Sequence, residues 1–353
     1  MKILTEPVGS IPRPKYLTDA LQSFALKQIN ENELSDLIDE ALKDTIKRFE
    51  ETGSPVITDG EQSKPSFATY PISGLENLSP DGVLIPFADG HTRQLPKITT
   101  GPFHYKTYAD SYLTRAKQFT SLPVKQAVIA VSAISLLYPQ EGIETYSREQ
   151  FIHDLLNEAE ADIRRCLNNG AYNVQIDFTE ARLALKLDPG KGLLQSFINL
   201  NNEVLSRFTE EERKRIGVHS CPGGDRDSTH SADISYAELL PLLFELNAGN
   251  FYLEYAGEKD KSSVLASIKE NMRPFQRVFI GVTNVLDPRV ETPGEIRDLI
   301  LEAAKVISPE RLGTTDDCGF SPFADDDSTS RETAFAKIRS RIEGTGLAEE
   351  KLF

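Results

Sequence analysis

Two potential metal ligands, His219 and Cys221, stand two positions apart at the end of a short apolar run. Residues two apart in a β-strand point to the same face, so this imidazole and this thiol can reach one point. Together they would supply half of a zinc site. The alternative is a buried cysteine beside a hydrogen-bonded histidine, because free cysteine is often buried for packing alone. An isolated His-x-Cys pair favours that simpler interpretation.

The elements that would position these residues alternate between short β-branched runs and longer helical stretches. We predict strands at residues 3–8, 56–58, 125–130, 172–176, 216–219, 250–253, 277–280 and 311–315. We predict helices at residues 31–51, 109–119, 148–167, 193–208, 236–246, 262–271, 293–306 and 329–341. Eight strands alternating with eight helices predict an α/β fold, a single (β/α)8 TIM barrel over residues 1–353. A doubly wound sheet is the alternative, but no Gly-x-Gly-x-x-Gly motif follows the first strand.

Residues 69–107 interrupt this alternation. The stretch is rich in proline, glycine and aromatic residues, and Ala88-Asp89-Gly90-His91 is typical of a hairpin turn. We predict a hairpin inserted after the second strand, which would form a lid or a side wall of the barrel.

Barrel enzymes carry their chemistry at the C-terminal ends of the strands. Polar residues fall at those ends here: Ser10, Asp59, Glu61, Asp177, His219, Cys221, Glu254 and Cys318. We expect the interior strand positions to be apolar instead. Taken alone, Glu254 could be a salt-bridged strand end and Cys318 a packed thiol, and we interpret Cys166 as structural. Together, however, His219, Cys221, Glu254 and Cys318 offer four donors of the types zinc accepts on one rim, and they predict a bound zinc ion.

The predicted donor set favours thiol chemistry over hydrolysis. Zinc bound by thiolates activates water poorly compared with zinc bound by three neutral histidines. It is better suited to holding an incoming thiol as the thiolate, which is the nucleophilic form. We therefore expect alkyl transfer to sulfur.

The composition excludes some partners. The formal net charge is −15, from 54 acidic and 39 basic residues, which argues against nucleic acid or an anionic membrane as a partner. The first residues show no signal-peptide pattern, and no run approaches the ~18 apolar residues of a membrane span. Three widely spaced cysteines do not make a disulfide framework. We expect a cytoplasmic protein.

Six short motifs occur in one order along nearly the whole chain: Val8-Gly9-Ser10-Ile11-Pro12, Asp59-Gly60-Glu61, Gln175-Ile176-Asp177, His219-x-Cys221, Glu254 and Asp317-Cys318-Gly319. In these motifs the chain resembles the C-terminal catalytic half of cobalamin-independent methionine synthase and the single-barrel proteins related to it. The resemblance implies a zinc-dependent methyltransferase whose Zn²⁺ is held by His219, Cys221, Glu254 and Cys318. It also implies that homocysteine or a similar thiol binds near Gly9, Ser10, Asp59, Glu61 and Asp177.

These residue types suit an amino-acid thiol. The backbone N–H groups and the hydroxyl at Gly9 and Ser10 can hold a carboxylate, and Glu61 and Asp177 can hold an ammonium. An acid at or near Asp177, or a bound water, is the candidate that protonates the leaving group, and Asp177 is the catalytic residue that we predict.

The alkyl donor is open. We expect no counterpart of the duplicated N-terminal barrel of methionine synthase, and the chain has no tryptophan to stack on a folate pterin. Phe67, or an aromatic residue between Tyr70 and Tyr108, could take the place of that tryptophan. The family also follows the strand-four aspartate with Glu-Pro-Ala, whereas Asp177 is followed by Phe178-Thr179-Glu180-Ala181. The donor could be methyltetrahydrofolate or a methyl group delivered by a partner protein.

Three alternative functions remain. The opening at residues 5–14 is also similar to epoxyalkane:coenzyme M transferase, in which Arg13 would face an anionic group of the thiol; the alternative is a solvated Arg13 in a rigid loop. A metal-free barrel of the uroporphyrinogen decarboxylase type would need basic residues at its mouth, where only Arg13, Lys64 and Arg289 are scattered candidates. A non-catalytic barrel with structural zinc would close all four positions with protein ligands.

Overall fold

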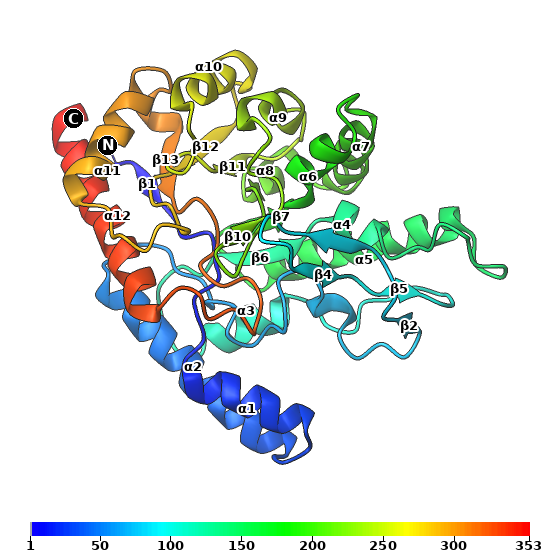
Figure 1. Ribbon diagram of the computed structural model, residues 1–353. Helices are drawn as coiled ribbons and strands as arrows, with labels where there is room; N and C mark the ends of the chain where they lie inside the picture. Colours follow the sequence, from blue (N-terminus) through cyan, green and yellow to red (C-terminus); the bar gives the residue numbers. More distant parts are fainter. Residues whose placement is uncertain (1) are drawn as a thin grey trace.

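The computed structural model describes residues 2–353, and its centre is a seven-stranded parallel sheet in the order β1-β13-β12-β11-β8-β7-β6. The strands are β1 (Leu4–Thr5), β6 (Gln126–Ile129), β7 (Val174–Asp177), β8 (Ile216–Ser220), β11 (Asn250–Leu253), β12 (Arg277–Gly281) and β13 (Leu312–Thr315). The first strand pairs with the last, Leu4 opposite Gly313, so the sheet curls towards closure. The predicted α/β barrel is confirmed, and Figure 1 shows the helices arranged around it.

The predicted strand at residues 56–58 is reduced to one bridge. Ile57 pairs in parallel with Val124, just ahead of β6, and the N–H of Lys125 donates to the Ile57 carbonyl at 2.8 Å. The hydroxyl of Thr58 then donates to the carbonyl of Gly9 at 2.8 Å, beyond the end of β1. This stretch therefore fills the gap between β1 and β6.

Eight helices match the predicted ones within a few residues, except that the last extends much further. They are α2 (Glu31–Glu51), α3 (Asp110–Ala116), α5 (Arg148–Asn168), α7 (Gly192–Leu205), α9 (Tyr236–Leu243), α10 (Lys261–Asn271), α11 (Pro293–Ala304) and α12 (Arg331–Leu352). Four further α-helices were not predicted: α1 (Lys15–Ala25), α4 (Val131–Ser135), α6 (Glu180–Leu187) and α8 (Glu210–Arg213). Helices α1 and α2 pack against each other through a small apolar cluster of their own and project from the bottom of Figure 1.

Residues 69–107 form two antiparallel pairs. Strand β2 (Leu78–Ser79) pairs with β5 (Lys97–Ile98), and β3 (Leu84–Pro86) pairs with β4 (Thr92–Gln94). The β3–β4 turn rests on a second small hairpin, β9 (Gly224–Asp225) and β10 (Ser228–Thr229), which follows β8. The N–H of Ala88 donates to the carbonyl of Thr229 at 2.9 Å.

The expectation of apolar strand interiors is wrong for one cluster. Glu6, Lys125 and Gln175 are all buried inside the barrel. The carboxylate of Glu6 accepts hydrogen bonds from Asn173 at 2.9 Å and from the Tyr252 hydroxyl at 2.6 Å. The ammonium of Lys125 donates to Gln175 Oε1 at 2.7 Å. Such groups can be buried because each has a partner.

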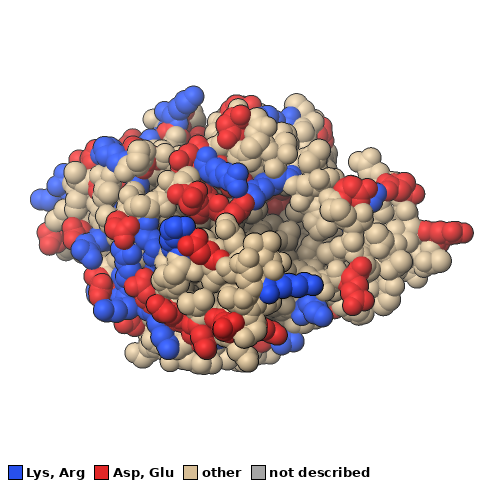
Figure 2. All heavy atoms as spheres, turned by 60° about the horizontal axis from the view of Figure 1, so that its bottom comes forward, with Lys and Arg blue, Asp and Glu red and all other residues tan. Residues whose placement is uncertain are grey.

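No helix within residues 2–353 combines the length and the apolarity needed to cross a lipid bilayer. On the face shown in Figure 2, acidic and basic side chains are interspersed over much of the surface. This face therefore shows no basic stripe of the kind that follows a nucleic-acid backbone.

Candidate metal centre and active-site cavity

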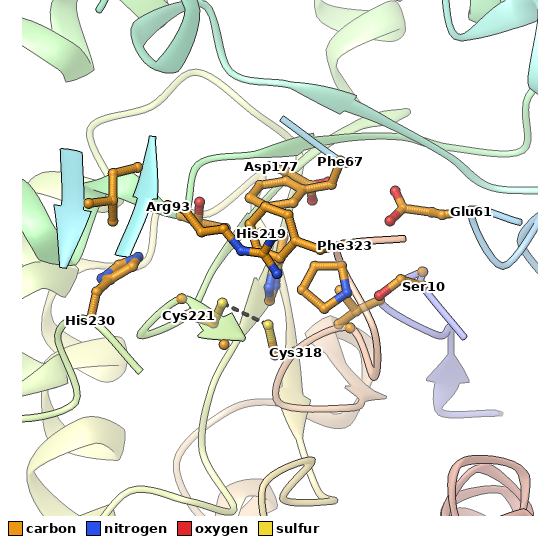
Figure 3. Close-up of a pocket in the computed structure, with 18 of the residues that line it drawn as sticks. Ser10, Glu61, Phe67, Arg93, Asp177, His219, Cys221, His230, Cys318 and Phe323 are labelled. Carbon is orange, nitrogen blue, oxygen red and sulfur yellow. Dashed lines mark hydrogen bonds between the residues drawn. The ribbon is translucent and has the colours of Figure 1, made fainter. Parts of the chain in front are cut away.

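Three of the four predicted metal ligands converge. His219 lies on β8, Cys221 directly follows β8, and Cys318 follows β13. One ligand atom from each of the three lies within 4.8 Å of the others, and all three side chains are buried. The two sulfur atoms are 2.9 Å apart and are joined by the dashed line in Figure 3.

The histidine is oriented as a metal ligand would be. Its Nδ1 donates to the backbone carbonyl of Tyr252 at 3.1 Å, which leaves the Nε2 lone pair free. Nε2 is buried and has no hydrogen-bond partner. A buried polar atom without a partner is costly, whereas a metal ion would use this lone pair. The donor set and this unpartnered atom fit zinc.

The two thiols are chemically unequal. The hydrogen bond from Cys221 lowers the pKa of the Cys318 thiol well below its ordinary value. The same contact, with burial, raises the pKa of Cys221 well above its ordinary value. Cys318 is therefore the thiol that more readily provides a thiolate, which is the form that binds zinc.

Glu254, the fourth predicted ligand, lies outside the group of three. Its Oε2 accepts a hydrogen bond from Arg182 Nη1 at 2.7 Å. Burial raises the pKa of Glu254 well above its ordinary value, with the nearby Asp317 adding to the effect. Asp317 in turn accepts three backbone N–H bonds, from Tyr255, Ala256 and Gly257 at 2.8, 2.9 and 2.6 Å. The loop after β11 is thus tied to the residue that precedes Cys318.

A cavity opens above the three converging ligands. Figure 3 shows Ser10 and Glu61 at one end, the two cysteines in the middle and His230 at the other end. The cavity leaves about 70 Å³ for the centres of water-sized molecules. That is several times the ~10–15 Å³ that one water needs. A small amino-acid thiol is of a suitable size for this space.

Gly9 and Ser10 line the cavity as predicted. The Ser10 hydroxyl oxygen accepts a hydrogen bond from the N–H of Ser321 at 3.1 Å, so its own proton remains available. A Cβ on Gly319 would lie 2.2 Å from this oxygen, so only glycine leaves room for it. The Asp317-Cys318-Gly319 motif therefore positions the Cys318 thiol and leaves space for the Ser10 hydroxyl.

Glu61 also lines the cavity, but Asp59 does not. Glu61 has a left-handed backbone with a φ of 56°, a conformation that non-glycine residues seldom adopt. Asp59 Oδ1 accepts the Glu61 N–H at 3.0 Å and so stabilises that conformation. The buried ammonium of Lys64 lies 3.0 Å from Glu61 Oε1. Asp59 and Lys64 thus hold Glu61 in place from behind the cavity wall.

Asp177 ends β7 and faces the cavity beside His219. Its Oδ1 accepts a hydrogen bond from Gln175 Nε2 at 2.7 Å. Burial, together with the charge of Glu61, raises the pKa of Asp177 to about 6. Such a carboxyl can release or take up a proton close to neutral pH.

The hairpin β3–β4 covers the cavity. Ile85, Phe87 and Arg93 line it from this side. The guanidinium of Arg93 donates to Asp225 at 2.5 and 3.0 Å and to Asp325 at 2.9 and 3.0 Å. We call this three-residue contact the Arg93 latch. It ties the hairpin to the loops that follow both ligand-bearing strands.

The sequence-based prediction for Arg13 is wrong. Arg13 is buried and donates to the backbone carbonyls of Glu61 and Lys64 at 2.7 Å, so it faces neither solvent nor an anionic substrate. Of the aromatic residues from Tyr70 to Tyr108, Phe87 lines the cavity, whereas Tyr70 and Tyr108 do not and their hydroxyls bond to Asp162 and Glu158. Phe67 does line the cavity, where it meets Phe323 edge to face at 5.5 Å.

The chain and its fold are similar to known proteins. A family model described as the catalytic domain of cobalamin-independent synthase matches residues 3–334. The chain belongs to the cobalamin-independent synthase family. Methionine synthase of Sulfurisphaera tokodaii is 20% identical to it over 99% of this chain and 93% of that protein. Methionine synthase of Pyrococcus furiosus is 20% identical over 98% and 93% of the two chains.

Two solved structures of this family share the fold. A B12-independent methionine synthase from a Shewanella species, in complex with selenomethionine, has a TM-score of 0.77 at 19% identity and covers 100% of this chain and 99% of its own. A putative methionine synthase from Listeria monocytogenes has a TM-score of 0.73 at 23% identity, over 98% of both chains.

Several cavity residues had no signal in the sequence. Arg93 lines the cavity from β4, and its partner Asp225 lies in β9; in such short hairpin strands a charged residue is ordinary. His230 is buried at the far end of the cavity, where its Nδ1 lies 2.8 Å from the Ser231 hydroxyl. Burial lowers the pKa of His230 to about 4, so its ring is neutral at pH 7. The positions of Arg93 and His230 in the cavity depend on which loops pack together over the barrel. No local sequence pattern predicts that packing.

Proposed function

We propose that this chain is a zinc-dependent S-methyltransferase that transfers a methyl group to the thiol of homocysteine or a closely similar amino-acid thiol. The observation that carries the proposal is the convergence of His219, Cys221 and Cys318 beneath a cavity that also contains Glu61 and Asp177. Family membership and the methionine synthase relatives support the same chemistry. Glu254 is proposed as the fourth zinc ligand, which requires its carboxylate to keep one oxygen on Arg182 and turn the other towards the sulfurs.

The cavity residues have separate tasks in this proposal. Zinc, when bound, supplies the positive charge that keeps a substrate thiol in its thiolate form. The N–H groups and hydroxyl at Gly9 and Ser10 hold the substrate carboxylate, while Glu61 and Asp177 hold its ammonium. The thiol is thereby oriented before the reaction, which lowers the entropic cost of the transfer. The S–CH₃ bond forms as the bond from carbon to the donor breaks. The ionised Asp177 takes up the proton that the thiol releases and passes it on to the leaving group.

The cavity argues against the two enzymatic alternatives. Arg93 is the one Lys or Arg among its lining residues, and both Asp225 and Asp325 already neutralise it. Lys64 is buried against Glu61, and Arg289 pairs with Glu295 on the surface. A decarboxylase acting on several carboxylates, or a transferase for an anionic thiol such as coenzyme M, would need free cationic groups here.

Zinc analysis with X-ray absorption tests the proposal. We expect one zinc per chain, and we expect homocysteine to add a sulfur to the metal's coordination sphere. Homoserine is the matched control, because it carries the same carboxylate and ammonium but has no thiol. Absence of zinc, or a coordination sphere that homocysteine leaves unchanged, would contradict the proposal. If the proposal holds, formation of methionine from homocysteine and methyltetrahydrofolate would identify a folate as the methyl donor.

A further inference from the structure

A one-way chain of hydrogen bonds inside the barrel leads to Asp177. Lys125 immediately precedes β6, does not line the cavity and is 0% exposed. Its ammonium donates to Gln175 Oε1 at 2.7 Å, and Gln175 Nε2 donates to Asp177 Oδ1 at 2.7 Å. Gln175 and Asp177 are two apart on β7, so they share one face, and both line the cavity.

The chemistry of the three groups fixes the direction of this chain. An ammonium can only donate hydrogen bonds, and an ionised carboxylate can only accept them. An amide between them therefore has one satisfactory orientation, with its oxygen towards Lys125 and its NH₂ towards Asp177. Without the ammonium, the Gln175 amide would be free to rotate and to place its oxygen against Asp177.

The surroundings of Lys125 keep its side chain in this position. Glu6 Oε2 lies 3.9 Å from its Nζ. The Nζ also lies 3.8 Å from the ring centroid of Tyr252, a favourable cation–π distance. The Tyr252 hydroxyl in turn donates to Glu6 at 2.6 Å. Burial lowers the pKa of Lys125 to about 8, so the ammonium still predominates at neutral pH.

We propose that Lys125 is a positioning residue that orients the Asp177 carboxylate through Gln175. Asp177 Oδ1 is then held by the protein, and its other oxygen is kept for the substrate. The part of this inference that concerns substrate rests on the proposed function, under which the substrate group is the ammonium of an amino-acid thiol. The geometric part does not rest on it.

Crystal structures of the zinc-loaded wild type and of Lys125→Met test the geometric part. Methionine has a similar length and no donor. We expect the contact between Gln175 and Asp177 to be lost or the amide to be reversed in the variant. Unchanged positions of Gln175 and Asp177 would overturn the proposal. Lys125→Met can be combined with Glu6→Gln, which removes both buried charges. If the single variant Lys125→Met does not fold, this double variant is compared with the wild type instead.

Calorimetric titration with homocysteine tests the functional part. We expect Lys125→Met to bind homocysteine about 10- to 100-fold more weakly, which is typical when the partner that orients a ligand-binding group is removed, while zinc content is retained. Tyr252→Phe is the matched control, since it removes the hydroxyl that bonds to Glu6 but keeps the ring beside Lys125 and the Glu6 charge; its affinity should change less than about threefold.

A double-mutant cycle separates positioning from general structural damage. If Lys125 acts through Gln175, then Lys125→Met combined with Gln175→Met should lose no more affinity than Gln175→Met alone. Additive losses would overturn the proposal. A wild type that binds no homocysteine would remove the proposed function, and the crystal structures would still decide whether Lys125 orients Asp177.

Discussion

The two cysteines that follow β8 and β13 can be distinguished from the third by their surroundings. Cys221 and Cys318 meet His219 at the base of the cavity, whereas Cys166 lies in α5 and is buried among apolar side chains. We predict that Cys221→Ser and Cys318→Ser each reduce zinc from about one per chain to a small fraction, because one ligand is lost. Activity should fall by at least about 100-fold.

Atomic spectroscopy and circular dichroism provide the measurement. The fold should persist in both variants, and Cys166→Ala is the control that should keep its zinc and activity. A full complement of zinc in either serine variant would remove that cysteine from the ligand set.

Glu180 is a buried carboxyl group with an incomplete set of hydrogen bonds. It is 8% exposed; its Oε1 accepts from Ser132 at 2.5 Å, and its Oε2 has no partner. Burial raises its pKa from 4.5 to about 7. The folded protein therefore binds an extra proton between these two pH values. Glu180 thus lowers the free energy of unfolding as the pH rises from about 4.5 to about 7, by up to roughly 3 kcal/mol.

Replacement of Glu180 by glutamine isolates this effect, because the amide resembles the protonated carboxyl and does not titrate. We predict that Glu180→Gln gains about 1–3 kcal/mol of stability relative to the wild type between about pH 5 and about pH 8. Urea unfolding of the wild type and of Glu180→Gln at about pH 5 and at about pH 8 measures this difference in stability. An equal difference at both would show that Glu180 does not titrate in this range.

At the scale of elements, the β3–β4 hairpin forms one wall of the cavity. Arg93 ties it to Asp225 and Asp325, and its guanidinium stacks 4.3 Å from the Phe323 ring centroid. We predict that Arg93→Met loosens the hairpin and leaves the buried Asp225 with fewer donors. KM for the thiol substrate should rise about 10-fold, and proteolysis within residues 87–91 should be faster.

Arg226→Met is the matched control for the latch, because Arg226 also pairs with Asp325 but does not line the cavity. It should change KM and proteolysis little, as is usual for an exposed ion pair. Equal effects of the two substitutions would mean that surface charge, not the latch, controls the hairpin.

The helices and strands differ in how far the sequence predicts them. Helix α2 was predicted with its observed bounds because its apolar residues repeat at helical spacing; the structure adds a capping box from Asn30 and Glu33. Helix α6 was missed because it has only eight residues, fewer than the roughly 11 over which helical spacing can be recognised. The strand predicted at 56–58 contributes only the Ile57 bridge, since pairing depends on neighbours distant in sequence.

The same contrast holds in the site. His219, Cys221 and Cys318 were predicted because the C-terminal ends of the strands lie on one rim of a barrel, although Glu254 on the same rim lies outside the group. Lys125 and Gln175 were not predicted, because a charged side chain in a strand interior is satisfied only by a partner from another strand. The residues next to Lys125 in the sequence do not indicate that its side chain contacts Gln175 and Glu6.

At the scale of the whole molecule, glycines in the strands make room for aromatic rings in the barrel. A Cβ on Gly313 would lie 2.3 Å from the Phe279 ring, which is itself stacked on Tyr252 at 4.7 Å. We predict that Gly313→Ala lowers the free energy of unfolding by about 1–3 kcal/mol through overpacking. Urea unfolding measures this loss.

The control for this prediction is Gly346→Ala. Gly346 lies in α12, and a Cβ there would meet no atom within 4 Å. This substitution should raise the stability by about 0.5–1 kcal/mol, because alanine favours a helix. Equal effects at Gly313 and Gly346 would mean that the barrel interior adapts to the added carbon.

The pairing of β1 with β13 also has a consequence for how the protein is made. At roughly 5–20 residues per second, a ribosome that has synthesised Leu4 needs about 15–60 s to reach Leu312. During that interval β1 has no partner strand, and Cys221 emerges well before Cys318. The barrel therefore cannot close until β13 has been synthesised, and the three residues that would hold zinc cannot converge until Cys318 has followed it.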